Sequence, residues 1–126
     1  MSSFPLHDES TAPDAAKAAL AATRRHFGMV PNLERVMASV PALLAAYSAS
    51  WDLFETVSLS PIERQVVYLT ANFENECDYC VPWHSLLAER AGMSAADLDA
   101  LRAGGSLADQ RLQALHVFTK ALIHER

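Results

Sequence analysis

The sequence has few cysteines and no long uninterrupted apolar run. Only two cysteines occur in 126 residues, which excludes a scaffold held together by several disulfide bonds. The longest uncharged stretch, residues 36–51, contains a proline and falls short of the roughly 20 apolar residues that a membrane helix needs. No basic segment followed by an apolar run opens the chain, so we expect no secretory leader and a cytoplasmic location.

Basic residues are scarcer than acidic ones. The chain has 10 Lys and Arg against 15 Asp and Glu, for a net charge of −5 at pH 7. The two signs are interspersed, and there is no basic stripe of the kind that binds nucleic acid. An acidic balance argues against binding to anionic membrane surfaces and favours solubility. We therefore expect neither a nucleic acid nor a membrane as a partner.

The alternation of apolar and polar residues that is typical of β-strands is also absent. The chain is instead rich in Ala and Leu, and its 51% of hydrophobic residues suffice for one core. Helix boundaries are marked by Gly28 as a stop, Asn32 as a cap, and Ser60 with Glu63 as a capping box. These signals predict an all-α fold of six or seven helices in a single domain, residues 1–126.

Apolar spacing predicts which parts of the helices are buried. We expect Met29 and Val30 to insert into the core, and the helix over residues 41–55 to be well buried because it is apolar all round. Two further helices carry one apolar stripe each, formed by Ile62, Val66, Leu69 and Phe73 and by Leu112, Leu115, Phe118 and Leu122. The last stripe needs a partner, so we predict a homo-oligomer whose interface includes residues 41–55 or the C-terminal helix.

The most informative segment is Cys77-Asp-Tyr-Cys80-Val-Pro-Trp-His84. Proline is tolerated only in the first turn of a helix, so Pro82 places a helix start within residues 78–81. Both sulfurs then lie at or just before the helix N-terminus, where unpaired N–H groups and the helix dipole favour a thiolate. His84 lies one turn beyond Cys80, where a neutral imidazole can take the thiol proton and an imidazolium can stabilise the thiolate.

Two cysteines at this spacing suit redox chemistry. They can close a disulfide by a small movement, and a sulfenic acid on one can be resolved by the other. Zinc is an alternative: Cys77, Cys80 and His84 supply three ligands and Glu76 a fourth, although ligands this close on one helix rarely form a tetrahedron. A chance pair of buried cysteines, with His84 as a core histidine, is the remaining alternative. We predict a thiol site that needs neither a metal nor a cofactor.

The segment SPIERQVVYLTANFENECDYCVPWHS resembles the central part of the alkylhydroperoxidase D / carboxymuconolactone decarboxylase-like family. In that pattern a capped helix precedes an Asn, here Asn75, and then C-x-x-C-x-x-x-H. Residues 26–47 and the segment LQALHVFTKALIHER are similar to the peroxidase-related branch of the family. The resemblance covers most of the chain, and the cysteine motif is its most specific part.

The resemblance implies an all-helical fold, assembly as a homo-oligomer, and reduction of a hydroperoxide with electrons from a dithiol donor. It also implies roles for the motif residues. Cys80 would attack the peroxide, Cys77 would resolve the product, and His84 would relay a proton.

The sequence departs from the family pattern at three points. The relay Glu twelve residues before the first cysteine is Gln65 here, and an amide cannot carry a proton as a base does. Glu63, Glu74 or Glu76 are candidates to replace it, although each is more often a solvated helix residue. Tyr79 stands where some members have a His, and members often continue into a further helical segment, so this chain is expected to lack it.

We therefore predict a thiol-dependent hydroperoxide reductase, or a disulfide reductase that uses the same cysteine pair. One alternative is a redox-sensing or small-molecule-binding oligomer without efficient turnover, which Gln65 supports. A lactone decarboxylase-like enzyme is a second alternative. The cysteine pair argues against it, because decarboxylation of a lactone needs acid–base groups and not a dithiol.

Overall fold

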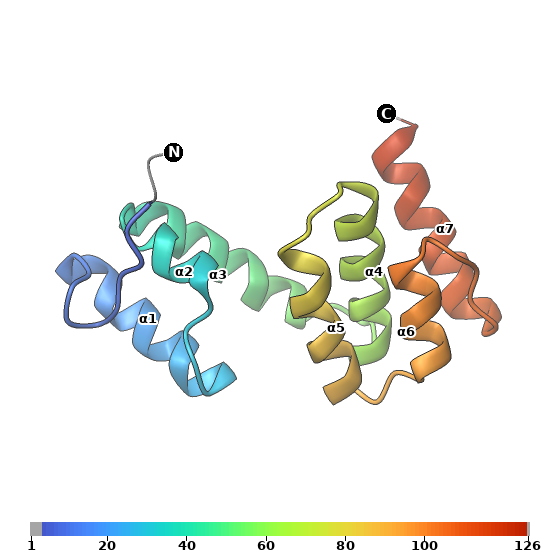
Figure 1. Cartoon of the computed structure of the whole chain (residues 1–126), viewed down its shortest axis with the longest axis horizontal. Coiled ribbons are helices and arrows are strands. Elements are labelled where there is room, and N and C mark those ends of the chain that lie inside the picture. Colours follow the sequence, from blue (N-terminus) through green and yellow to red (C-terminus); the bar gives the residue numbers. More distant parts are fainter. Residues whose placement is uncertain (1–3, 126) are drawn as a thin grey trace. The chain divides into compact units, whose positions relative to one another are not determined.

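A computed structural model describes residues 4–125, and within them the chain forms seven α-helices and no strand (Figure 1). The predicted all-α fold is thus confirmed. The helices are α1 (Asp14–Phe27), α2 (Asn32–Met37), α3 (Pro41–Glu55), α4 (Pro61–Glu74), α5 (Cys80–Arg90), α6 (Ala95–Arg102) and α7 (Gln110–His124). No helix within this described part combines the length and the apolar character needed to cross a membrane.

The helices fall into two compact units, one over Met1–Val57 with α1 to α3 and one over Ser58–Arg126 with α4 to α7. Each unit has its own cluster of buried apolar side chains. Val66, Leu69, Ala88, Met93, Leu98, Leu101 and Leu107 form the cluster of the second unit. Ala12, Ala16, Leu20, Val30, Ala38 and Leu44 form that of the first. The single domain over residues 1–126 stays a prediction.

Most predicted helix boundaries are confirmed by local hydrogen bonds. Gly28 ends α1 in the left-handed region at φ 79°, and its N–H donates to the carbonyl of Arg24. At the start of α4 the Ser60 hydroxyl accepts from the Glu63 N–H, and the Glu63 carboxylate accepts from the Ser60 N–H. The predicted cap at Asn32 is wrong. Asn32 is already the first residue of α2 and makes no capping bond, because Pro31 occupies the cap position.

In the first unit, α3 packs against both α1 and α2. Two of the burial predictions are wrong here. Met29 is 51% exposed, since only Val30 of that pair turns into the core. Helix α3 is not well buried either: Leu44 is the one fully buried apolar side chain it contributes, while Leu43 and Leu53 are exposed. The sequence is apolar all round α3, but the unit has only two helices to cover it.

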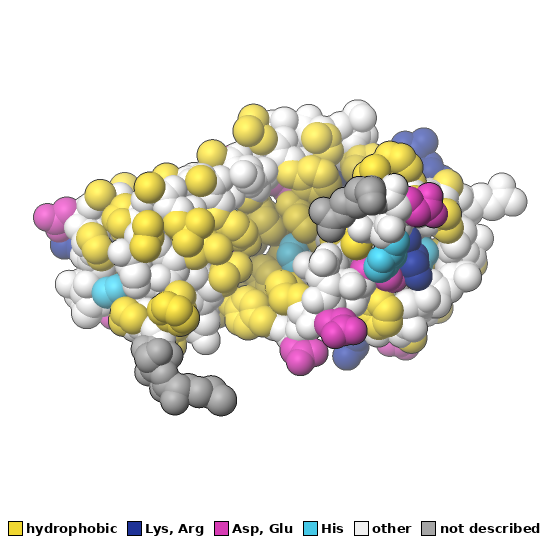
Figure 2. Space-filling model, turned by 90° about the horizontal axis from the view of Figure 1, so that it is seen from above, with side chains coloured by type: hydrophobic (Ala, Val, Ile, Leu, Met, Phe, Trp, Pro, Cys, Tyr) yellow, Lys and Arg dark blue, Asp and Glu magenta, His cyan; other side chains and the backbone are white. Residues whose placement is uncertain are grey.

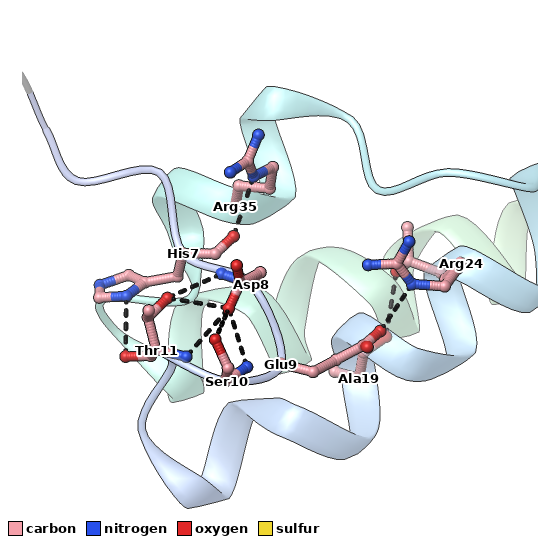
Figure 3. Close-up of polar contacts among 9 residues, drawn as sticks. His7, Asp8, Glu9, Ser10, Thr11, Ala19, Arg24 and Arg35 are labelled. Carbon is pink, nitrogen blue, oxygen red and sulfur yellow. Dashed lines mark hydrogen bonds and ion pairs between the residues drawn. The ribbon is translucent and has the colours of Figure 1, made fainter.

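The segment before α1 is tied to the rest of the first unit by polar contacts (Figure 3). The Arg35 guanidinium on α2 donates to the carbonyls of Leu6 and His7. The Asp8 carboxylate accepts the N–H groups of Ser10 and Thr11, which closes a tight turn. These bonds explain why a segment with little regular structure follows a defined path.

In the second unit, α4 lies between α5 on one side and α6 with α7 on the other (Figure 1). Val66 and Leu69, in the middle of the predicted stripe, are fully buried, whereas Ile62 and Phe73 at its ends are only partly covered. Polar contacts also join α4 to α7. The hydroxyl of Thr70 lies 2.7 Å from Nδ1 of His116, and both side chains are buried.

Large apolar side chains are exposed on both units (Figure 2). Within the predicted stripe of α7, Leu112 and Leu115 pack against the core of the second unit, but Phe118 and Leu122 are 59% and 60% exposed. Val117 beside them is also exposed. The half of the stripe nearer the C-terminus is therefore without a partner among the described residues.

A glycine is required after α6. Gly104 has φ 66°, and a Cβ added there would lie 2.5 Å from Cε1 of Phe73. Gly92 has φ 88° but no atom within 4 Å of its added Cβ. We expect Gly92→Ala to lower the free energy of unfolding by about 1–2 kcal/mol through backbone strain. Gly104→Ala should lower it by about 1–3 kcal/mol more, because Phe73 must also move.

Urea unfolding followed by circular dichroism measures the two changes. Combining Gly104→Ala with Phe73→Leu should recover part of the loss. Equal losses for Gly92→Ala and Gly104→Ala would show that the packing of Phe73 on Gly104 is unimportant.

Candidate functional site

The turn between α4 and α5 places the cysteines. Glu76, the second residue after the end of α4, adopts the left-handed conformation at φ 53°. Its N–H donates to the carbonyl of Phe73, and the N–H of Cys77 donates to the carbonyl of Asn72 at 3.0 Å. These two bonds form a Schellman motif, in which a left-handed residue satisfies the last carbonyls of a helix. Glycine is the usual residue at that position, so no local sequence signal indicates that Glu76 has this role.

The cysteine pair lies at the start of α5, as predicted. Cys80 is the first residue of that helix, and Pro82 lies within its first turn. A disulfide joins Cys77 to Cys80, with 5.3 Å between their Cα atoms. The N–H of Cys80 also donates to the sulfur of Cys77 at 3.2 Å. Both cysteines are only partly buried, so this pair can be reached from solvent.

His84 lies one turn further along α5 and is 6% exposed. Its Nδ1–H donates to Oε1 of Gln65 on α4 across 3.0 Å. Gln65 itself is buried. Sequence analysis singled out both residues but did not predict that they are bound to each other.

Tyr68 is a site residue that the sequence analysis missed. Its ring stacks on the imidazole of His84, with 4.3 Å between ring centroids and 25° between planes. It follows Gln65 by three residues on α4, and residues three apart share one face of a helix. That spacing was the available signal, because any residue on this face near Gln65 can contact the same neighbour.

The surroundings of His84 keep it neutral. Burial lowers its pKa to about 4, so it carries no charge at pH 7. The Gln65 carbonyl oxygen accepts a hydrogen bond from Nδ1–H, so Nδ1 carries the ring proton. The other nitrogen, Nε2, is then unprotonated and has the lone pair that can accept a proton. His84 is thus a neutral imidazole and not an imidazolium at pH 7.

The three candidate carboxylates are engaged differently. Glu63 closes the capping box and pairs with Arg111, whose hydrogen bond contributes most to holding the Glu63 pKa down at about 2. Glu74 binds His124 at 2.6 Å and Lys120 at 2.9 Å, and the bond to His124 contributes most to its lowered pKa. Glu76 is exposed and forms the turn. Glu63 and Glu74 are thus both engaged in ion pairs with α7.

A hollow of about 800 Å³ lies beside the cysteines within the second unit. Cys77 lines it together with Phe73, Val81 and Pro82, while Arg102 and His124 add basic groups. Cys80 and His84 are not among its lining residues. Tyr79, where some members of the resembling family have a His, is 45% exposed. Of the two cysteines, Cys77 is the one that lines this hollow.

Among residues 4–125, no three His, Cys, Asp or Glu side chains are grouped in a way that could hold a metal ion. The zinc alternative needed Cys77, Cys80, His84 and Glu76 together. In the structure the two sulfurs are bonded to each other and His84 donates to Gln65.

Comparison with known proteins agrees with the fold and with the motif. The sequence model of the Carboxymuconolactone decarboxylase family matches residues 38–120, a range that contains α3 to α6, most of α7, and every candidate site residue. That family includes alkylhydroperoxidase D-like proteins. No curated protein matches the chain. Because the match covers well over half of the sequence, the chain belongs to the carboxymuconolactone decarboxylase family.

Proposed function

We propose that the protein is a thiol-dependent hydroperoxide reductase that uses Cys77 and Cys80 as a dithiol/disulfide pair. The observation that carries the proposal is the disulfide at the start of α5, since this bond is the oxidised end of such a cycle. In the first step the Cys80 thiolate attacks the hydroperoxide, which yields a sulfenic acid and an alcohol. The Cys77 thiol then displaces water from the sulfenic acid and forms the disulfide.

A dithiol donor completes the cycle. Its first thiolate attacks one sulfur of the disulfide, and its second thiol releases it, so the donor leaves as a disulfide and both protein thiols are restored. The hollow beside Cys77 supports attack at that sulfur. Cys80 would then leave as the thiolate, at the helix start where the N–H groups and the dipole stabilise it.

His84 is proposed to accept the thiol proton of Cys80, and Gln65 to orient His84 for that transfer. In a neutral His84 that is protonated on Nδ1, the unprotonated Nε2 can accept the thiol proton of Cys80, one turn away on α5. Gln65 acts through His84 as a positioning residue, because its carbonyl oxygen fixes which ring nitrogen is protonated. The neutral state at pH 7 supports a base and not an ion-pair partner.

The second candidate is a redox sensor that oxidises without efficient turnover. It is favoured by the amide at Gln65, since the family pattern has a carboxylate there and an amide cannot take up the proton of His84. Lactone decarboxylation remains the other activity that the family name suggests, and it would make no use of the cysteine pair. Sustained consumption of a dithiol only in the presence of peroxide separates the reductase from both.

Homo-oligomeric assembly is also part of the proposal. The exposed apolar side chains on α3 and on α7 support it, because clusters of exposed apolar side chains often mark a surface that another subunit covers. A cytoplasmic location is expected as well, where a thiol pair is kept reduced between turnovers.

The roles of the two cysteines are tested by mass spectrometry after one equivalent of hydroperoxide. The reduced protein should lose the mass of both thiol hydrogens and recover it with dithiothreitol. Cys77→Ser should stop at a sulfenic acid that a thiol-blocking reagent traps, and Cys80→Ser should not react. A Cys80→Ser variant that is oxidised as fast as the wild type would assign the attack to Cys77.

The role of His84 is tested by the pH dependence of Cys80 oxidation. His84→Ala should slow the reaction by a factor of about 10 or more, as expected for a positioned acid–base group. Because burial lowers the His84 pKa to about 4, the imidazole stays neutral as pH falls through 6.5. The rate difference between wild type and His84→Ala should thus persist to about pH 4–5 and vanish only below it. A difference that disappears near pH 6.5 would show an ordinary, solvated histidine.

Restoring the carboxylate at position 65 tests the positioning role of Gln65. In Gln65→Glu a negative charge would replace the amide oxygen 3.0 Å from Nδ1, which should raise the pKa of His84 and make it a stronger base. We expect faster Cys80 oxidation near neutral pH and a higher His84 pKa in nuclear magnetic resonance titrations. Gln110→Glu, at the exposed start of α7, is the control for added charge. If the His84 pKa does not move, the contact between the two side chains is not maintained in solution.

A further inference from the structure

The first unit contains a pocket that the thiol chemistry does not use. It has a volume of about 260 Å³, and residues of α1, α2 and α3 line it, among them Thr23, Glu34, Ser48 and Asp52. A cavity of about 15 Å³ already holds one water molecule, so this pocket has room for a molecule of several heavy atoms. Thr23 and Glu34 precede the range that the family match covers, so that match does not assign a role to them.

Glu34 is the unusual member of the pocket. The residue is 5% exposed, and its Oε2 atom has no hydrogen-bond partner among the described residues. Burial raises the pKa of this carboxyl group, because the charged form is poorly solvated there. Buried carboxylates are normally paired or hydrogen-bonded. An unsatisfied buried oxygen on a residue that lines a pocket therefore indicates that a hydrogen-bond donor binds there.

The hydroxyl of Thr23 also calls for a donor in the pocket. It donates its proton to the carbonyl of Ala19, one turn earlier on α1, across 3.1 Å. A hydroxyl has a single proton, so Thr23 can only accept a hydrogen bond from a ligand in the pocket. An ionised carboxylate such as that of Glu34 is likewise an acceptor only. Ser48 on α3 lines the same pocket with a hydroxyl that can accept as well. A ligand that satisfies these groups must therefore supply more than one donor.

The charge and size of the ligand follow from the same pocket. The buried carboxylate of Glu34 and the exposed carboxylate of Asp52 both favour a positive charge, whereas His26, which also lines the pocket, is exposed to solvent. No group of three His, Cys, Asp or Glu side chains within residues 4–125 could hold a metal ion here. A primary ammonium group has one positive charge, three N–H donors and no acceptor, so it meets both requirements. The volume lies below the usual range for drug-sized ligands, so the ligand is small.

We propose that this pocket binds a small primary amine in its protonated form, with the ammonium group donating to the Glu34 carboxylate and to the hydroxyl of Thr23. The proposal is independent of the function proposed for Cys77 and Cys80, because neither cysteine lines the pocket. Binding would give the Glu34 oxygen its missing partner. It would also offset the cost of burying the charged carboxylate, since a nearby opposite charge favours the ionised form.

Propylammonium chloride is the probe. Propan-1-ol is the control ligand without the charge, and tetramethylammonium chloride is the control ligand that keeps the charge but has no N–H group. The full chain is titrated with each while the backbone amide signals of Thr23, Glu34 and Ser48 are followed by nuclear magnetic resonance. Propylammonium should shift these signals with saturation at about millimolar concentration, as expected for a ligand of this size. Both controls should bind at least about 10-fold more weakly, since one lacks the charge and the other the donors.

Two variants of the pocket test the groups that hold the ammonium. Glu34→Gln keeps the size of the side chain and should weaken propylammonium binding by about 10-fold or more. Thr23→Val removes only the hydroxyl acceptor and should weaken it by about 3-fold or more. Glu89→Gln removes one charge from an exposed site on α5 and should bind propylammonium like the wild type.

Three results would each overturn the proposal: no saturable shift, a control ligand that binds as tightly as propylammonium, or an unchanged affinity in either variant of the pocket. If Glu34→Gln fails to fold, Thr23→Val and the comparison of the three ligands on the wild type decide.

Discussion

The cysteine site depends on the backbone hydrogen bonds that end α4. With Glu76 in the left-handed conformation, the N–H of Cys77 reaches the carbonyl of Asn72, and the chain reverses within a few residues. Helix α5 can therefore begin at Cys80 and pack against α4 (Figure 1). The short distance between the cysteine Cα atoms and the bond from His84 to Gln65 both require this reversal.

Packing of α5 on α4 also determines the electrostatics of the site. His84 is placed against Gln65 and under the ring of Tyr68, so desolvation outweighs every other influence on its pKa and keeps it neutral. A carboxylate at position 65 would raise the pKa of His84 and so oppose the desolvation. The amide of Gln65 only determines which ring nitrogen carries the proton. The carboxylates nearest in sequence do not compensate, because Glu63 and Glu74 hold α4 to α7 through ion pairs.

The two units use their apolar residues in different ways. In the second unit α4 is covered on both sides, and its core side chains are almost fully buried. In the first unit three helices share a smaller core, and α3 exposes Leu43 and Leu53. The same shortage of covering helices leaves the carboxylate of Glu34 beside a pocket and not in a filled core. The small core of the first unit thus leaves apolar side chains of α3 exposed, and it leaves an oxygen of Glu34 buried without a hydrogen-bond partner among the described residues.

Sequence alone determined the helices and the place of the cysteines, because these follow from local rules. Gly28, the Ser60–Glu63 box and Pro82 act on the backbone within one turn, and the fold class and the start of α5 were predicted from such signals. Contacts between helices were not predictable in this way. The bond from His84 to Gln65 and the stacking of Tyr68 depend on how α5 lies on α4, and the exposure of Met29 and α3 depends on how many helices surround them. Hydrophobic spacing indicates which face of a helix seeks burial, but only the tertiary structure decides whether a neighbour is there to bury it.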